Sequence, residues 1–248
     1  MQNGELRGNY AEHARFWDWS GHDRAEEHEY WLRCAKKYGK NILIPMCALG
    51  ETGAYMARRG YSVTAFDITP EMIAEGRKRY GDVPGLRLLE ADVMDFRFDI
   101  PFVDFCFSMD FEVLHSMEDI KKALVCINKH LRPGGGLIVS AQPLPRETSD
   151  WPLETYLPQK QIYPCIRVWK TGSGHTDAET GRRYISQTFY AEDEIGHIES
   201  FEHSFTMQCY SREEWVAALK ECGFNIVKHR DHGPKTGYGG DCIEAIKT

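Results

Sequence analysis

From residue 41 onward the chain alternates short apolar runs with segments of helical pattern, and this alternation constrains the fold more than any other feature. The apolar runs cover residues 41–47, 61–67, 86–93, 102–109 and 137–141, and each has the pattern of a strand. Strands separated by helices pair in parallel through βαβ crossovers, with helices on both faces of an open sheet. The sequence therefore predicts an α/β chain built on a mostly parallel sheet.

Start and stop signals delimit the helices. Helical patterns occupy residues 51–59, 70–80, 117–131 and 211–222. Thr69 is an N-cap candidate followed by Pro70 at the first helical position, and Ser211 with Glu214 forms a capping box. The Pro-Gly run at 132–136 is expected to close the third helix. Two more strands are expected near the C-terminus, at residues 224–229 and 242–247.

The stretch from about residue 150 to 210 breaks this rhythm. Its runs IRVW, RRYISQTFYA and SFTMQCY alternate apolar and polar residues, which is typical of antiparallel strands. We interpret it as an insertion that forms a small sheet rather than as a separate domain. A length of 248 residues fits one large domain with such an insertion.

Composition weighs against several classes of partner without excluding them, because a local basic patch can coexist with a negative total. Thirty basic and thirty-seven acidic side chains give a net charge of −7, which weighs against a nucleic-acid backbone or an anionic membrane as partner. The eight cysteines are spread singly, which favours a reducing, cytoplasmic setting. No apolar stretch reaches about 18 residues, so no membrane span is expected. His229 and His232 have no acidic cluster beside them, so we expect no metal site.

Three loops should meet at the carboxyl edge of the sheet, where open α/β sheets bind ligands. The first spans residues 45–53, after the first strand. Asp67 ends the second strand, 17 residues beyond Gly50, where an acid can accept both hydroxyls of a ribose. Asp92 ends the third strand and can accept from an adenine amino group. Two acids at consecutive strand ends indicate a ligand that contains adenosine, although acids on a solvated rim give the same pattern.

At these residues the chain resembles the class I S-adenosylmethionine-dependent methyltransferases. The resemblance runs from residue 41 to 141, through NILIPMCALGETGAYMARRGYSVTAFDITPEMIAEGRKRYGD, LLEADVMDF, FVDFCFSMDFEVLHSM and INKHLRPGGGLIVS. It implies a Rossmann-like seven-stranded sheet whose last strand is antiparallel. The implied parts are an N-terminal helical cap at 1–40, a cofactor-binding core at 41–149, a β insertion at 150–210 that caps the substrate, and the last helix and strands at 211–248.

The resemblance also implies S-adenosyl-L-methionine as cofactor and assigns it contacts. The positions that match the family's cofactor-binding motifs are Met46, Ala48, Gly50, Asp67, Ile68, Asp92, Val93 and Ser108. Tyr10 is a further candidate catalytic residue. It lies in an aromatic N-terminal segment that folds over the cofactor in small-molecule members of the family, or else packs on the sheet edge. Glu112 and His115 follow the fourth strand and are candidates for the general base, although His115 can equally be structural.

The chain departs from the family in the loop after the first strand. The family's acidic-x-Gly-x-Gly-x-Gly pattern aligns with residues 44–50, where the acid is Ile44, the first two glycines are Met46 and Ala48, and only Gly50 is kept. Positive φ costs other residues roughly 1–2 kcal/mol. Two outcomes are open: a negative-φ path that still binds through backbone N–H groups and the helix opening near Gly50, or weakened binding. We expect binding to be retained.

Three functions compete at this point. The first is methyl transfer to a small amine, hydroxyl or carboxylate acceptor. The second is a non-catalytic, regulatory protein on the same fold with weakened cofactor binding. The third, a nicotinamide enzyme, requires G-x-G-x-x-G after the first strand, which PMCALG does not supply. We expect the first, in a monomer or homodimer, with the net negative charge mildly favouring neutral or cationic acceptors.

Overall fold

The computed structural model describes residues 10–14, 17, 24–109, 111–141, 144–145, 147–156, 165–230 and 241–248. The helices are α2 (Ala25–Ala35), α3 (Glu51–Ala57), α4 (Pro70–Tyr80), the short 3₁₀ helix η2 (Phe111–Val113), α5 (Met117–His130) and α6 (Arg212–Glu221). His232 and part of the expected N-terminal cap lie outside the described residues. Within the described part of the chain, no helix is both long and apolar enough to cross a membrane.

The core is a seven-stranded sheet in the order β3-β2-β1-β4-β5-β11-β10. Its strands are β1 (Asn41–Pro45), β2 (Ser62–Asp67), β3 (Leu86–Glu90), β4 (Val103–Ser108), β5 (Leu131–Ser140), β10 (Phe224–Arg230) and β11 (Cys242–Lys247). All pairs are parallel except the two made by β11, which is antiparallel to both β5 and β10. The expected fold class, including the antiparallel last strand, is confirmed.

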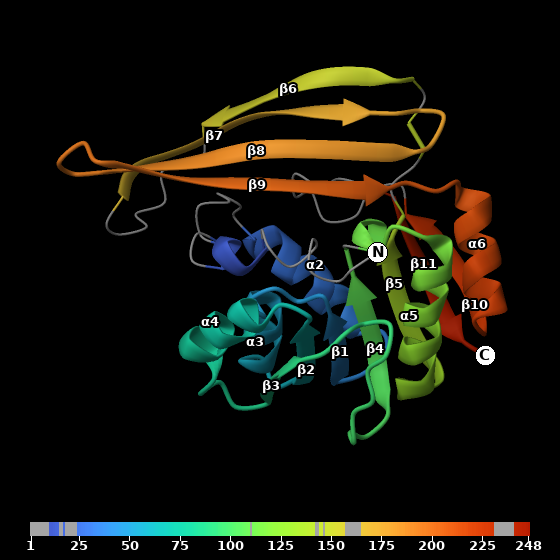
Figure 1. The fold of residues 1–248 in the computed structure, drawn as a ribbon. Coiled ribbons are helices and arrows are strands. Elements are labelled where there is room, and N and C mark those ends of the chain that lie inside the picture. The colour runs from blue at the N-terminus through green and yellow to red at the C-terminus, as the bar shows by residue number, and fades with distance from the viewer. Residues whose placement is uncertain are drawn as a thin grey trace.

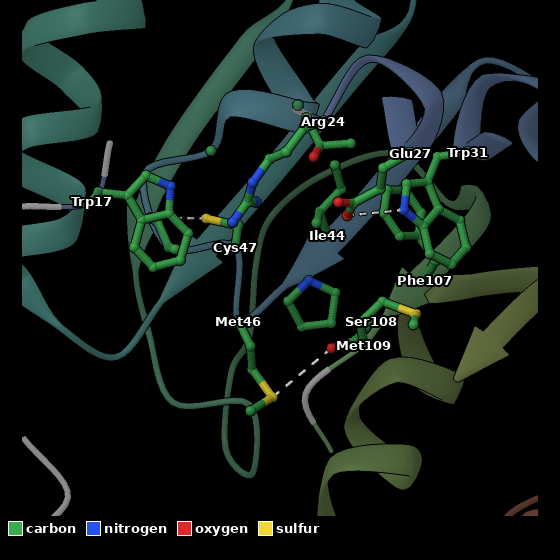
Figure 2. A pocket seen from close by; sticks show the side chains of 15 residues that line it. Trp17, Arg24, Glu27, Trp31, Ile44, Met46, Cys47, Phe107, Ser108 and Met109 are labelled. Carbon is green, nitrogen blue, oxygen red and sulfur yellow. Dashed lines mark hydrogen bonds between the residues drawn. The ribbon is translucent and has the colours of Figure 1, made fainter. Parts of the chain in front are cut away.

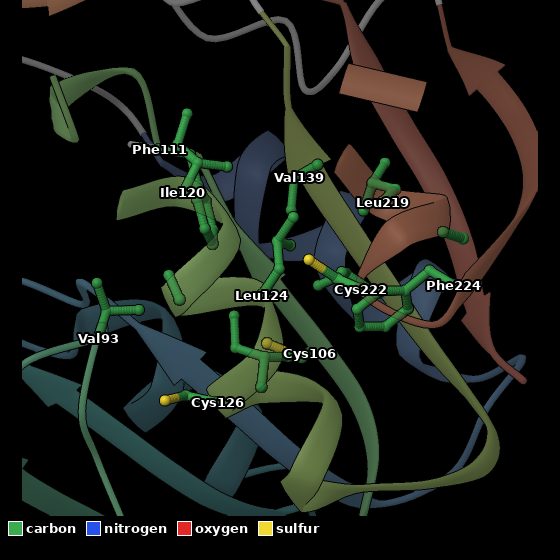
Figure 3. Packing of buried hydrophobic residues seen from close by; sticks show 14 of the residues in the cluster. Val93, Cys106, Phe111, Ile120, Leu124, Cys126, Val139, Leu219, Cys222 and Phe224 are labelled. Carbon is green, nitrogen blue, oxygen red and sulfur yellow. The ribbon is translucent and has the colours of Figure 1, made fainter. Parts of the chain in front are cut away.

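Helices cover both faces of this sheet, and the alternation along the strands shows why. On β1, Leu43 packs into one core cluster, while Ile42 and Ile44 pack into a second cluster on the opposite face. Ile120 and Leu124 of α5 and Leu219 of α6 bury the first face, as Figure 3 shows. Because both faces are covered, the central strands β1 and β4 are buried at nearly every position, as expected of a parallel sheet.

The insertion forms a second sheet of four antiparallel strands in the order β6-β7-β8-β9. Its strands are β6 (Ser149–Tyr156), β7 (Cys165–Thr176), β8 (Arg182–Asp193) and β9 (Ile198–Gln208). In Figure 1 this sheet lies as a separate layer over the carboxyl ends of β1, β4 and β5. The expected small antiparallel sheet after the fifth strand is confirmed.

Several predicted boundaries were wrong. β3 ends at Glu90 rather than at residue 93, and α3 ends at Ala57 rather than at 59. The run at 132–136, expected to be a turn, belongs to β5, which already starts at Leu131. An irregularity in the β4–β5 pairing absorbs the extra residues: Val103 pairs with Leu131, but Phe105 pairs with Gly136.

Gly76 allows α4 to lie directly against the loop after β1. A Cβ at this position would come 2.3 Å from the Leu49 carbonyl oxygen. We therefore expect Gly76→Ala to lower the free energy of unfolding by about 1–3 kcal/mol, measured by urea denaturation. A helical glycine with open space should instead gain up to about 1 kcal/mol from alanine. A stabilised Gly76→Ala variant would contradict this close approach.

Candidate functional site

A pocket opens at the carboxyl ends of β1 and β4, beneath the insertion sheet. Its walls come from the loop after β1, from Phe107, Ser108 and Met109 at the end of β4, and from Trp17 and the start of α2. Burial and the nearby Asp67 raise the pKa of the Cys47 thiol in this wall. The thiol therefore stays protonated and is a poor nucleophile.

The loop after β1 keeps a glycine-like backbone although two of its glycines are replaced. Met46 has φ +56° and Ala48 has φ +50°, and they are the two non-glycine residues with positive φ in the described chain. Gly50 follows with φ +78° as the N-cap of α3. The expected negative-φ path is therefore wrong. Strain of this kind persists where the surroundings enforce it, and it clusters at functional sites.

The Met46 side chain is half-buried and is one of the residues that line the pocket. It packs against the core cluster on the α5 face, and its Sδ lies 4.0 Å from the Ser108 Oγ. In Figure 2 it points away from Arg24 and Glu27. The Met46 side chain therefore lines the part of the pocket beside Ser108, away from the charged residues Arg24 and Glu27.

Restoring one glycine should relieve strain. We expect Ala48→Gly to raise the free energy of unfolding by about 0.5–1 kcal/mol, because relief of roughly 1–2 kcal/mol exceeds the added chain entropy of glycine. Ala74, exposed in the middle of α4, is the matched control, and Ala74→Gly should cost about 1 kcal/mol. Urea denaturation of both variants checks the opposite signs; equal losses would contradict strain at Ala48.

Asp67 ties the loop to the end of β2. Its Oδ2 accepts from the Ala48 N–H at 2.9 Å, and its Oδ1 accepts from the Thr69 N–H at 3.0 Å. Burial raises the pKa of this carboxyl, and the backbone hydrogen bonds oppose that rise. The Thr69 side chain and the Ile68 backbone also donate to this carboxyl, so local donors occupy most of its roughly four acceptor positions. The carboxylate therefore braces the strained loop, and its place at the end of β2 is the feature that fits the predicted ribose role.

The other predicted adenosine contacts lie further along the same edge. Asp92 is half-buried, and its Oδ1 accepts from the Met94 N–H at 2.8 Å. The Val93 side chain is buried in the core, which leaves its backbone as the group that can face a ligand. Ile68 is half-buried directly after β2. None of these residues, nor Asp67, lines the pocket at β1 and β4.

Sequence reasoning missed the three pocket residues at the start of α2: Arg24, Glu27 and Trp31. Trp31 stacks on Phe107 with ring centroids 4.1 Å apart, and its Nε1 donates to Glu27 Oε1 at 3.4 Å. Arg24 lies 4.8 Å over the Trp17 ring and 3.9 Å from a Glu51 carboxylate oxygen. The sequence shows that Arg24 and Glu27 are charged and that Trp31 is aromatic, but no local sequence pattern predicts that these residues lie beside β1.

This set matches the charges of an α-amino acid. Glu27 offers an acceptor for an ammonium group, and Arg24 offers a donor fork for a carboxylate. Burial raises the pKa of Glu27, and the nearby Arg24 opposes the rise. With Asp67 available for a ribose and Asp92 beyond it, the donor set fits S-adenosylmethionine from its methionyl end towards its adenine.

The three predicted catalytic residues do not meet in the pocket wall. Glu112 is fully buried in η2, where the Ser140 Oγ donates to its Oε2 at 2.6 Å, and this burial does not support a general base. His115 Nδ1 lies 3.3 Å from the Thr206 Oγ1, and burial together with Arg182 lowers the pKa of His115. Tyr10 packs edge-on against His203. Ser108, by contrast, does line the pocket.

Comparison with known proteins agrees with the geometry. A family model described as a methyltransferase domain matches residues 46–139. YqeM of Bacillus subtilis, which is named as a methyltransferase, is 21% identical over 200 residues. The match covers 79% of this chain and 78% of YqeM. The chain spans between 42% and 48% of the length of the other curated relatives it matches. One of these is a demethylmenaquinone methyltransferase of Chlorobaculum tepidum, which is 34% identical over 109 residues, 42% of each chain.

Solved structures share the whole fold. The S-adenosylmethionine-bound structure of CalS10, an amino pentose methyltransferase from Micromonospora echinaspora, superposes with a TM-score of 0.73 at 19% identity. That match covers 100% of this chain and 98% of CalS10. The sugar N-methyltransferase KedS8 from Streptoalloteichus gives a TM-score of 0.74 at 18% identity, covering 94% and 91% of the two chains. At this level of identity the likeness shows the fold, insertion sheet included.

Proposed function

We propose that this chain is a class I S-adenosylmethionine-dependent methyltransferase and that it methylates a small-molecule acceptor held between the cofactor pocket and the insertion sheet. The observation that carries the proposal is the insertion sheet itself, which covers the carboxyl edge above the pocket (Figure 1). A covered site of this kind admits a modest substrate and excludes a folded macromolecule. Two structural neighbours, CalS10 and KedS8, bear the names of sugar methyltransferases.

The chain's own residues bind and orient. When bound, the cofactor supplies an electrophilic methyl group on a sulfonium. Glu27 and Arg24 hold the two charged ends of the methionyl group, and Asp67 holds the ribose. Trp31, stacked on Phe107, gives the pocket a rigid apolar wall that excludes water. Methyl transfer needs mainly this alignment, since an oriented nucleophile gains most of its rate from position.

The regulatory alternative rested on the altered glycine loop. Support for catalysis over that alternative comes from the positive φ angles at Met46 and Ala48, which keep the backbone path at a cost in strain. A protein that binds no ligand at this loop would gain nothing from this backbone strain.

The methionyl assignment has a direct test by calorimetry with two ligands. S-adenosylhomocysteine carries the amino-acid end, whereas 5′-methylthioadenosine lacks it. We expect Glu27→Gln and Arg24→Met each to weaken S-adenosylhomocysteine binding about tenfold and to leave methylthioadenosine unchanged. Equal loss for both ligands would reject the assignment.

The acceptor class has its own test. The purified protein is incubated with S-adenosylmethionine labelled in the methyl group, together with a cell extract divided by ultrafiltration into small molecules and macromolecules. We expect the label in the low-mass fraction. Label confined to protein or nucleic acid would contradict a small-molecule acceptor.

A further inference from the structure

The cofactor pocket has a charged end and a neutral end. Arg24 and Glu27 lie at the charged end, and the neutral end is formed by Met46, Ser108 and Met109 (Figure 2). The cavity has a volume of about 120 Å³, far below the roughly 300–1,000 Å³ of a site that encloses a whole small molecule. The pocket therefore takes one part of a cofactor, and each side chain in its wall limits what fits.

Met46 is a long side chain at a position where the backbone has a glycine-like conformation. Its φ is +56°, and the other residues of this loop with positive φ are Ala48 and Gly50. Of the three, Met46 alone carries a side chain beyond Cβ. Positive φ is unfavourable for a residue that has a Cβ. Met46 therefore fills a part of the pocket wall that glycine, the residue this backbone favours, would leave open.

The Met46 thioether is supported from behind. The side chain packs against the core cluster on the α5 face, and its Sδ lies 4.0 Å from the Oγ of Ser108. Ser108 is itself buried at the end of β4. The side chain thus bridges the loop after β1 and the end of β4. Because packed interiors yield little to even one extra methylene, this wall is a fixed boundary of the pocket.

We propose that Met46 determines which alkyl group the cofactor carries on its sulfonium, admitting methyl and excluding larger groups. The assignment rests on the proposed function, in which the charged end of the pocket holds the amino-acid group and Asp67 holds the ribose. Asp67 accepts from the Ala48 N–H at 2.9 Å, so the loop at residues 46–48 lies between these two ends. The sulfonium that joins them then passes beside Met46, and the thioether offers its alkyl group a soft apolar surface. One further methylene there meets a wall that cannot recede.

The test is calorimetric titration, without acceptor, with S-adenosylmethionine and with S-adenosylethionine, which is longer by one methylene. In the wild-type protein we expect S-adenosylmethionine to bind at least about tenfold more tightly, since one excess methylene in an apolar pocket changes affinity by about 10–200-fold. A smaller preference in the wild-type protein would overturn the proposal, whatever the variants do.

Two variants separate the size of this side chain from the strain of its backbone. Met46→Ala removes the thioether but keeps a Cβ at positive φ, and Met46→Gly removes both. We expect each to bring the two dissociation constants within about threefold of each other. Loss of the preference in Met46→Gly alone would assign it to backbone strain and overturn the role of the side chain, as would an unchanged preference in both variants.

Two control variants should keep the wild-type preference. Met46→Leu replaces the side chain by one of similar volume. Met94→Ala truncates another half-buried methionine, which packs against the same core cluster but does not line the pocket. Loss of the preference in either control would overturn the proposal, because the preference would then depend on something other than the volume of this wall.

The same titrations separate this inference from the proposed function. Binding of S-adenosylmethionine by the wild-type protein without selection against S-adenosylethionine rejects the role of Met46 alone. Absence of binding of both ligands rejects the proposed function and this inference with it. Binding of S-adenosylmethionine by each variant also shows that the variant is folded.

Discussion

Asp67→Ala should have two effects: S-adenosylhomocysteine binding should weaken at least tenfold, and the free energy of unfolding should fall. The lost ribose contacts alone correspond to about 1.4 kcal/mol. The substitution also leaves the Ala48 and Thr69 N–H groups without their acceptor. We expect the free energy of unfolding to fall by about 2 kcal/mol, since each stranded buried donor costs roughly 1–3 kcal/mol and removal of a buried carboxylate offsets part of it.

Calorimetry measures the affinity and urea denaturation the stability. Asp82→Ala, an exposed acid after α4, is the matched control and should change neither quantity. A variant with normal affinity would reject the ribose role. One with normal stability would reject the bracing of the loop.

Acid should destabilise the protein through His13. Because its pKa in the folded protein is about 3, against an ordinary value of 6.5, the folded state resists the proton that the unfolded chain accepts. Stability is therefore full above about pH 6.5 and is lost as the pH falls towards 3. At 1.36 kcal/mol per unit, the loss from this residue reaches about 3 kcal/mol by pH 4. His203, Arg24 and Lys170 face the ring, and none of them can neutralise an imidazolium.

Urea denaturation of wild type and His13→Phe from pH 7 to 4 checks this expectation. The phenylalanine fits among Phe189 and Phe201 but cannot be protonated, so its stability should fall less steeply with acid. His197→Phe, at an exposed position, is the control and should follow the wild type. Parallel curves for wild type and His13→Phe would show that His13 is protonated without cost.

The sheet was predictable because its signals are local. Each apolar run alternates between two buried faces, as Ile42, Leu43 and Ile44 do, and parallel pairing follows from the helices between the runs. Strand ends were less predictable, since the start of β5 depends on its register with β4. The helix start at Thr69 shows the same limit. Its side chain makes no capping bond, and Asp67 accepts its N–H instead.

The site was predictable where it follows strand ends and unpredictable where it depends on packing between distant segments. Asp67 and Asp92 lie at the ends of strands that the sequence reveals. Glu27 and Arg24 reach the pocket only because Trp31 docks α2 on Phe107, about 75 residues further along the chain. The positive φ of Met46 and Ala48 was equally hidden, because their residue types favour negative values.

The most direct test of the central claim is titration of the purified wild-type protein with S-adenosylmethionine and S-adenosylhomocysteine in a calorimeter. The strained loop, Asp67 and the Glu27–Arg24 pair predict one saturable site for each ligand, with dissociation constants in the micromolar range, on the order of −8 kcal/mol. Absence of binding to both ligands at millimolar concentration would contradict the account.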